Sequence, residues 1–200
     1  MTQGHPFAQM TPVEKKKDLL TKEERLQYSH ATLNALGFFD VEIWTDGAVS
    51  MEAHSTAAAA ALFATTTAGR TSILLPPRTA QVKCGPIACS YRCELVAILH
   101  GLQLLKGSKW RNRKVLIATD SQSAIRVLQA GPMAQRDPLN KQIWSHLQTL
   151  ANGDCHVTFQ HVFSHCGLPK NEIADRLASR TVESAKTAWY GRKPLLPMVQ

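Results

Sequence analysis

Apolar and polar positions alternate from residue 41 to residue 46, and this pattern predicts a half-buried β-strand. Val41 and Ile43 are apolar and alternate with residues that would face the other side of a sheet. Asp46 and Gly47 then interrupt the pattern, and Asp-Gly is a common turn sequence. We therefore expect the strand to end at Asp46, whose carboxylate either opens a turn or holds a ligand.

Two further strands are predicted at residues 55–67 and 70–79, with Gly69 between them. Together with the first strand, these segments favour an antiparallel meander of three strands. The consecutive alanines at 57–61 have high helix propensity, so a helix is the alternative for that segment.

The second half of the chain alternates between helical and strand patterns. Short apolar runs predict buried strands at residues 114–120 and 156–163. Because helices connect these strands, the strands should run parallel to the first one in a mixed sheet, which makes the fold class α/β. The helices predicted from apolar periodicity and end signals lie at residues 90–105, 121–130, 138–151 and from Pro169 onwards.

An amphipathic helix is predicted upstream of the first strand, over residues 11–36. Thr11 and Pro12 are a favourable N-cap and first-turn pair, and Gly37 would end the helix. Three leucines spaced seven residues apart form a narrow apolar stripe on an otherwise charged helix. We expect this helix to dock on its own domain or to connect it to another polypeptide segment.

Composition narrows the range of partners and compartments. The net charge of +8 is compatible with a polyanionic partner such as nucleic acid. No run of 18 apolar residues predicts a membrane span, and the N-terminal segment lacks the apolar core of a secretory signal. The five cysteines include no C-x-x-C pair, which favours reduced thiols and an intracellular protein, either nuclear or cytoplasmic.

A zinc cluster could be formed by four residues near the last predicted strand: Cys155, His161, His165 and Cys166. Zinc ligands usually come in close pairs on turns. Cys155 and His161 would instead lie six residues apart on one predicted strand, so zinc is disfavoured.

Other acidic residues, besides Asp46, occupy positions that a structural role explains poorly. Asp120 ends an apolar strand, although it could also cap the helix that follows. Glu94 borders the apolar face of its predicted helix, where a charge must be paired, protonated or bound to metal. Asp175 lies in the second turn of the last helix, where the helix dipole no longer stabilises it much.

These acids are predicted to meet at one edge of the sheet. Ligands bind at the carboxyl ends of parallel strands, so Asp46 and Asp120 should lie side by side. Neighbouring carboxylates cannot all ionise unless a cation compensates their charge. Mg²⁺ prefers such oxygen ligands, and a pair of these ions can activate water and stabilise the leaving oxygen of a phosphodiester. The sequence therefore favours metal-dependent phosphodiester cleavage.

Four blocks of the sequence resemble, in the same order, the signature motifs of type 1 ribonucleases H. The blocks are TDGAVS, SYRCELVAI, ATDSQSAI and HVFSHCGLPKNEIADRLA. They are most similar to the RNase H domain of retrotransposon (non-LTR type) reverse transcriptase polyproteins. This resemblance implies a ribonuclease H-like fold, with a five-stranded mixed sheet of order 3-2-1-4-5 flanked by helices. It divides the chain into a disordered segment and helix at 1–37, the RNase H domain at 38–185 and a tail at 186–200.

The resemblance also implies an activity, cofactors and site residues. In this family four acids bind two Mg²⁺ ions, for which Mn²⁺ is an expected substitute, and the RNA strand of an RNA–DNA hybrid is hydrolysed. The matching positions here are Asp46, Glu94, Asp120 and Asp175. His165 matches the histidine that assists proton transfer. The expected substrate-binding residues are Gly47, Ser90, Gln122 and Asn171.

Two alternatives to an independent enzyme remain at this point. The stretch 121–137 leaves little room for the basic protrusion that some cellular members of the family carry. In this respect the chain resembles retroelement domains whose affinity for substrate comes from an attached reverse transcriptase segment. A catalytically idle scaffold that binds nucleic acid or a polymerase is the rival function. The presence of all four acids favours the enzyme, and Glu94 together with the histidine loop argues against other nucleases or transposases of this fold.

Overall fold

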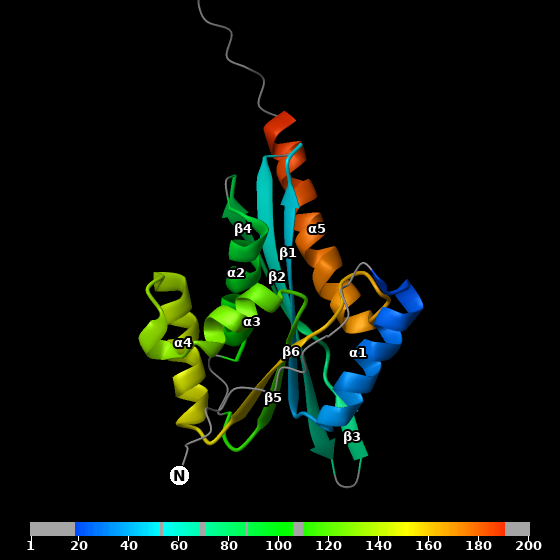
Figure 1. Cartoon of the computed structure of the whole chain (residues 1–200), viewed down its shortest axis with the longest axis vertical. Coiled ribbons are helices and arrows are strands. Elements are labelled where there is room, and N and C mark those ends of the chain that lie inside the picture. Colours follow the sequence, from blue (N-terminus) through cyan, green and yellow to red (C-terminus); the bar gives the residue numbers. More distant parts are fainter. Residues whose placement is uncertain (1–18, 53, 69–70, 87, 106–109, 191–200) are drawn as a thin grey trace, which may run out of the picture.

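The computed structural model describes residues 19–190, except 53, 69–70, 87 and 106–109, as a twisted sheet between two layers of helices (Figure 1). The helices are α1 (Lys22–Leu36), α2 (Ser90–Gln103), α3 (Gln122–Gln129), α4 (Pro138–Ala151) and α5 (Pro169–Tyr190), with a short 3₁₀ helix at Pro132–Ala134. The strands are β1 (Val41–Ser50), β2 (Ser55–Ala68), β3 (Thr71–Leu74), β4 (Arg78–Gly85), β5 (Lys114–Thr119) and β6 (His156–His161).

The sheet has the predicted mixed topology. The strand order is β3-β2-β1-β5-β6, and β4 pairs with β2 as well. β1 is antiparallel to β2 but parallel to β5, which is parallel to β6. Since β3 and β4 pair with different halves of β2, they fill one edge position, and the five positions follow the order 3-2-1-4-5. The predicted α/β, ribonuclease H-like fold class is confirmed.

The edge strand differs from the single strand predicted at 70–79. It is divided into β3 and β4, which are separated by Pro76 and Pro77. Proline has no N–H to donate to a β-ladder and is therefore excluded from the interior of a paired strand. β4 then continues to Gly85, beyond the predicted end.

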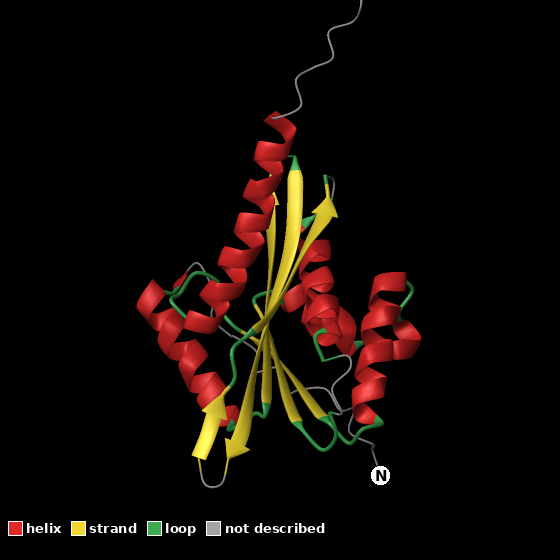
Figure 2. Cartoon of the chain, turned by 180° about the vertical axis from the view of Figure 1, so that it is seen from behind, coloured by secondary structure: helices red, strands yellow, loops and turns green. Residues whose placement is uncertain are grey.

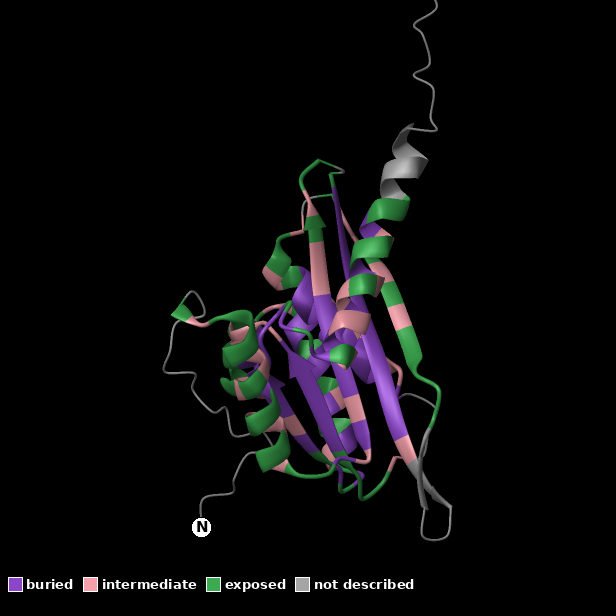
Figure 3. Cartoon of the chain, turned by 90° about the vertical axis from the view of Figure 1, so that its right-hand side faces the viewer, coloured by how far each residue is buried: buried purple, intermediate pink, exposed green. Residues whose placement is uncertain are grey.

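The two faces of the sheet are covered by different helices (Figure 2). α2, α3 and α4 bury the larger apolar cluster, which includes Ile43, Ile117 and Phe159. α5 and α1 cover the other face, around Trp44 and Phe163. Figure 3 views this second side and shows buried strands behind helices whose outer surfaces are exposed. No helix within the described residues is both long and apolar enough to span a membrane.

The alanine run at 57–61 belongs to strand β2, and the helical alternative is wrong. Each of the five alanines is at most 1% exposed, because helices pack on both faces of this strand. α2 approaches closely: a Cβ on Gly101 would lie 2.5 Å from Ile43 Cγ2 and 3.3 Å from Ala60 Cβ. The small side chains are therefore required by the helix–sheet packing, which outweighs local helix propensity.

Helix α1 begins at Lys22 and not near Thr11, so the predicted N-terminus of this helix is wrong; residues 11–18 lie outside the described part. Thr21 and Glu24 form a reciprocal capping box, with Glu24 N–H donating to Thr21 Oγ1 over 3.2 Å. The helix ends at Gly37, as predicted, with φ +78°. Of the two expected roles, docking on its own domain is confirmed, because Phe163 N–H donates to Ser29 Oγ over 3.3 Å.

Candidate active site

The position of Asp46 is determined by two different strand pairings. The predicted strand end at Asp46 is wrong, because β1 continues to Ser50 as the antiparallel partner of β2. The parallel pairing with β5, however, ends at Trp44 and Ala118. Asp46 and Asp120 each lie two residues beyond that last pair. The register therefore places both carboxylates at the point where β1 and β5 separate.

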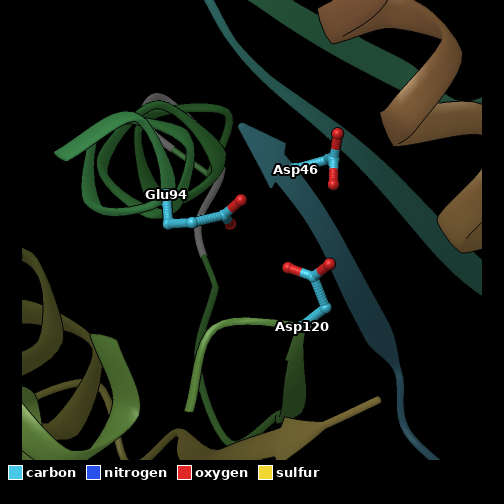
Figure 4. Close-up of side chains that lie close together, drawn as sticks. All are labelled: Asp46, Glu94 and Asp120. Atoms are coloured by element: carbon cyan, nitrogen blue, oxygen red, sulfur yellow. The ribbon is translucent and has the colours of Figure 1, made fainter. Parts of the chain in front are cut away.

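Glu94 from α2 joins the two aspartates. One carboxylate oxygen from each of Asp46, Glu94 and Asp120 lies within 4.8 Å of the other two. Figure 4 shows these side chains around a common space, extending from three different elements. Asp46 is 6% exposed and Glu94 4% exposed, whereas Asp120 is half-buried. Three acids that are far apart in sequence thus form an acidic triad, as the sequence predicted.

The carboxylate of Glu94 is fixed at both oxygens. Gly47 N–H donates to Oε1 over 2.7 Å, and the Thr119 hydroxyl donates to Oε2 over 3.3 Å. There is no room for a side chain at position 47, because a Cβ would lie 2.8 Å from Cys93 Cβ and 2.9 Å from Glu94 Oε1. Gly47 therefore positions Glu94 directly, and its expected contact with substrate stays a prediction.

Ser121, not Asp120, caps helix α3. The Ser121 hydroxyl accepts a hydrogen bond from Ala124 N–H over 3.3 Å, as an N-cap residue does. Asp120 precedes this cap and directs its carboxylate toward the triad. The structural alternative for Asp120 is therefore wrong.

Burial and mutual repulsion favour the protonated forms of two of these acids. Burial, followed by the charges of Glu94, Asp120, Asp175 and Glu172, raises the pKa of Asp46 to about 9. Burial and the Asp120 charge raise the pKa of Glu94 to about 8, against the opposing hydrogen bonds from Gly47 and Thr119. A divalent cation would reverse this balance by favouring the ionised forms. Three convergent carboxylates are the oxygen donors that Mg²⁺ prefers, so the residues fit such an ion.

The metal-free protein should lose stability as the pH rises from about 4 to about 9. In the unfolded chain Asp46 and Glu94 ionise near their ordinary pKa values of 3.8 and 4.5, whereas in the folded protein they hold their protons up to about 9 and 8. Between these limits the unfolded state binds fewer protons, so the free energy of unfolding decreases. Mg²⁺ should oppose the loss and stabilise more at higher pH, because it binds the ionised carboxylates.

Thermal unfolding at pH 5, 7 and 9, with EDTA or with Mg²⁺, measures this dependence. Asp46→Asn serves as the comparison, because the asparagine cannot ionise. Its metal-free stability should vary less with pH than that of the wild type. An identical dependence in both proteins would contradict the assignment of the raised pKa to Asp46.

Asp175 does not belong to the triad. Its Oδ2 lies 3.3 Å from His165 Nδ1, and its negative charge contributes to the raised pKa of Asp46. The convergence predicted for four acids is thus observed for three, with Asp175 at the margin. His165 is exposed, on the loop that joins β6 to α5, and its backbone adopts φ +52°, which is uncommon for a residue other than glycine.

The expected substrate-binding residues differ in accessibility. Ser90 is exposed at the first position of α2, and Gln122 is partly exposed at the first position of α3. Asn171 is only 2% exposed, in the first turn of α5. Ser90 and Gln122 are thus accessible to a ligand, whereas the side chain of Asn171 is not on the surface. Their roles toward substrate stay predictions.

Three residues around the triad were not predicted from the sequence. Thr119 bonds Glu94, His161 lies 3.1 Å from the Asp120 carbonyl oxygen through its Nε2, and Glu172 adds to the electrostatic field at Asp46. Thr119 and His161 are paired in register at the ends of β5 and β6. A polar residue at the end of each apolar strand was the available signal, but only the strand register relates them to each other.

The chain belongs to the ribonuclease H family. The RNase H family model matches residues 39–183, and the acidic triad lies within that span. A ribonuclease H of Pseudomonas putida (strain W619) is 32% identical over 105 residues, which cover 48% of this chain and 68% of that protein. A ribonuclease H of Bordetella bronchiseptica is 33% identical over 105 residues, with coverage of 48% and 64%.

The fold is also similar to a solved viral structure. The crystal structure of the prototype foamy virus protease-reverse transcriptase aligns with a TM-score of 0.50 and 18% identity, covering 72% of this chain and 21% of that one. At this identity the likeness concerns the fold alone. The buried triad in a ribonuclease H-like fold is consistent with a catalytic site for a divalent metal.

Proposed function

We propose that this chain is a Mg²⁺-dependent endonuclease that hydrolyses the RNA strand of RNA–DNA hybrids. The observation that carries the proposal is the acidic triad, whose two buried members have raised pKa values that a divalent cation would lower. Membership of the ribonuclease H family, and similarity to bacterial ribonucleases H, support the hybrid as substrate.

Each acidic residue has a proposed role. Asp46, Glu94 and Asp120 would hold two Mg²⁺ ions, with Asp175 contributing from the margin and Mn²⁺ as a substitute. The ions would supply an activated water and charge stabilisation at the leaving oxygen. The hydrogen bonds from Gly47 and Thr119 orient the Glu94 carboxylate before any ion binds, so little reorganisation is needed.

Substrate selection would depend on the 2′-hydroxyl group, which distinguishes RNA from DNA in the wide minor groove of A-like helices. Ser90 lies four residues before Glu94, and Gln122 lies two residues after Asp120. Both are accessible and can donate and accept hydrogen bonds. Asn171 would act indirectly, through the loop that carries His165, because its side chain is buried.

The test is cleavage of a labelled RNA–DNA hybrid by the purified chain, compared with duplex DNA and duplex RNA at one salt concentration. We expect Mg²⁺-dependent cleavage of the hybrid RNA alone, and no cleavage with EDTA. Equal rates on all three duplexes would contradict hybrid selectivity. Hybrid binding without cleavage, at any Mg²⁺ or Mn²⁺ concentration, would establish the idle scaffold instead.

We further infer an origin in a retrotransposon (non-LTR type) polyprotein, with a reverse transcriptase segment as the partner that supplies substrate affinity. The short connection between α3 and α4, which holds only the 3₁₀ helix Pro132–Ala134, supports this inference. A basic protrusion would have to fit there. Adding the matching reverse transcriptase segment should lower the hybrid concentration needed for half-maximal cleavage; no effect would contradict the inference.

Replacing His165 by alanine should slow cleavage by about 100-fold without abolishing it. A single general acid–base group typically contributes about 10²–10⁴-fold, and the exposed position of this imidazole favours the lower end. Single-turnover cleavage measures the effect, and Mn²⁺ titration should give an unchanged affinity. Loss of Mn²⁺ binding in this variant would make His165 a metal ligand, contrary to its proposed role.

A further inference from the structure

His161, the last residue of β6, contacts the backbone of the triad residue Asp120. It is 9% exposed and is paired with Thr119 at the end of β5. Its Nε2 lies 3.1 Å from the carbonyl oxygen of Asp120. Because a carbonyl oxygen can only accept a hydrogen bond, Nε2 carries the hydrogen and donates it. The imidazole therefore holds the peptide group of a triad residue.

The imidazole ring is itself held in place. Its edge-to-face contact with Phe163 has a centroid distance of 5.5 Å and an interplanar angle of 79°. Phe163 in turn contacts Tyr28 of helix α1, with ring centroids 6.0 Å apart. Aromatic pairs of this geometry fix ring orientation as well as burying apolar area. The donor is thus aimed by ring contacts that link the segment after β6 to α1.

The peptide group that joins Asp120 to Ser121 is fixed at both its carbonyl and its N–H by side chains of the β5 and β6 ends. His161 donates to the Asp120 carbonyl, and the Thr119 hydroxyl accepts from Ser121 N–H over 3.2 Å. One backbone bond, from Val162 N–H to the Thr119 carbonyl over 3.0 Å, joins the two strand ends. The parallel ladder stops here, so these bonds replace it in restraining the backbone of Asp120.

We propose that His161 is a positioning residue that sets the metal affinity of the site by fixing the backbone of Asp120. This inference rests on the proposed function, since it concerns the ions of that site. Loss of an outer-shell hydrogen bond typically lowers metal affinity or activity about 10–100-fold. Nε2 of His161 is not available to bind an ion in this arrangement, because its hydrogen is directed at the carbonyl.

The test is Mn²⁺ binding by calorimetry in wild type, His161→Phe and His161→Gln. The phenylalanine keeps the edge-to-face contact with Phe163 but cannot donate, and its Mn²⁺ affinity should fall at least about 10-fold. The glutamine can place an N–H near the position of Nε2, and it should recover most of that loss. Leu147→Ala is the control: it shortens a buried side chain in the apolar cluster on the other face of the sheet, lowers thermal stability and should leave Mn²⁺ affinity unchanged.

Every outcome of these measurements supports or contradicts the positioning role of His161. Wild-type affinity in His161→Phe overturns it, as does an equal loss in the phenylalanine and glutamine variants. If His161→Phe does not fold, His161→Met replaces it, since methionine matches glutamine in length and cannot donate. Failure of the wild-type chain to bind Mn²⁺ or to cleave hybrid would instead overturn the proposed function, so the two failures are distinguishable.

Discussion

Replacing Asp46 by asparagine should abolish RNA cleavage and raise the free energy of unfolding of the metal-free protein at pH 7. The loss of activity should far exceed the about 10–100-fold cost of removing an outer-shell partner, because a ligand itself is lost. The gain in stability follows from the raised pKa of Asp46, about 9. At pH 7 its folding requires protonation of a carboxylate that is ionised in the unfolded chain, and asparagine avoids that cost.

Hybrid cleavage and denaturant unfolding, each with EDTA and with Mg²⁺, measure the two effects. Asp137→Asn is the matched control, because it also removes one carboxylate and the asparagine can still cap helix α4, where Asp137 accepts from Leu139 N–H. The control should cleave like wild type. If Asp46→Asn kept more than a few per cent of the wild-type cleavage rate, the loss would be no larger than the about 10–100-fold cost of removing an outer-shell partner. Asp46 would then not be a metal ligand.

Replacing Gly47 by alanine should lower the free energy of unfolding and should strongly reduce cleavage. The added Cβ would lie 2.8 Å from Cys93 Cβ, 2.9 Å from Glu94 Oε1 and 3.0 Å from Glu94 N. Overpacking of this kind costs about 1–3 kcal/mol of the free energy of unfolding. Relief requires α2 to move away from β1, and this movement displaces Glu94 from the hydrogen bond donated by Gly47.

Chemical denaturation and cleavage assays measure both effects. Val49→Ala on the same strand is the control, since this side chain is 42% exposed. It should change the free energy of unfolding by less than about 1 kcal/mol and leave cleavage unchanged. Wild-type Mn²⁺ affinity and activity in Gly47→Ala would show that the site tolerates the displacement, contrary to the positioning role of Gly47.

The order of strands and helices could be predicted because most of these elements have a strong local pattern of apolar residues. The broad apolar face of α2 and the apolar run of β5 gave the right element types, and the resemblance supplied the sheet order. Pro76 and Pro77 could have predicted the interruption, but the strand-like pattern on both sides of them led to a single predicted strand. The alanine run could not be assigned from its own residues, because its strand conformation depends on the approach of Gly101 from another element.

The acidic triad was predicted, but the prediction that Asp46 ends its strand was wrong. The turn signal of Asp46 and Gly47 marks a change of pairing partner, since β1 continues along β2 after leaving β5. Such a register is a non-local property, which no window of sequence contains. The same holds for Thr119 and His161, whose relation to the acids appears only when β5 and β6 are aligned.

Helix α1 lies outside the span matched by the family model, residues 39–183, yet it packs beside the loop that carries His165. Trimming the chain to the family boundaries would uncover Phe163, Leu168 and neighbouring apolar side chains that Leu26 and Leu33 now cover. We therefore expect the smallest stable fragment of this protein to be longer than the family domain and to start no later than the cap of α1 at Thr21.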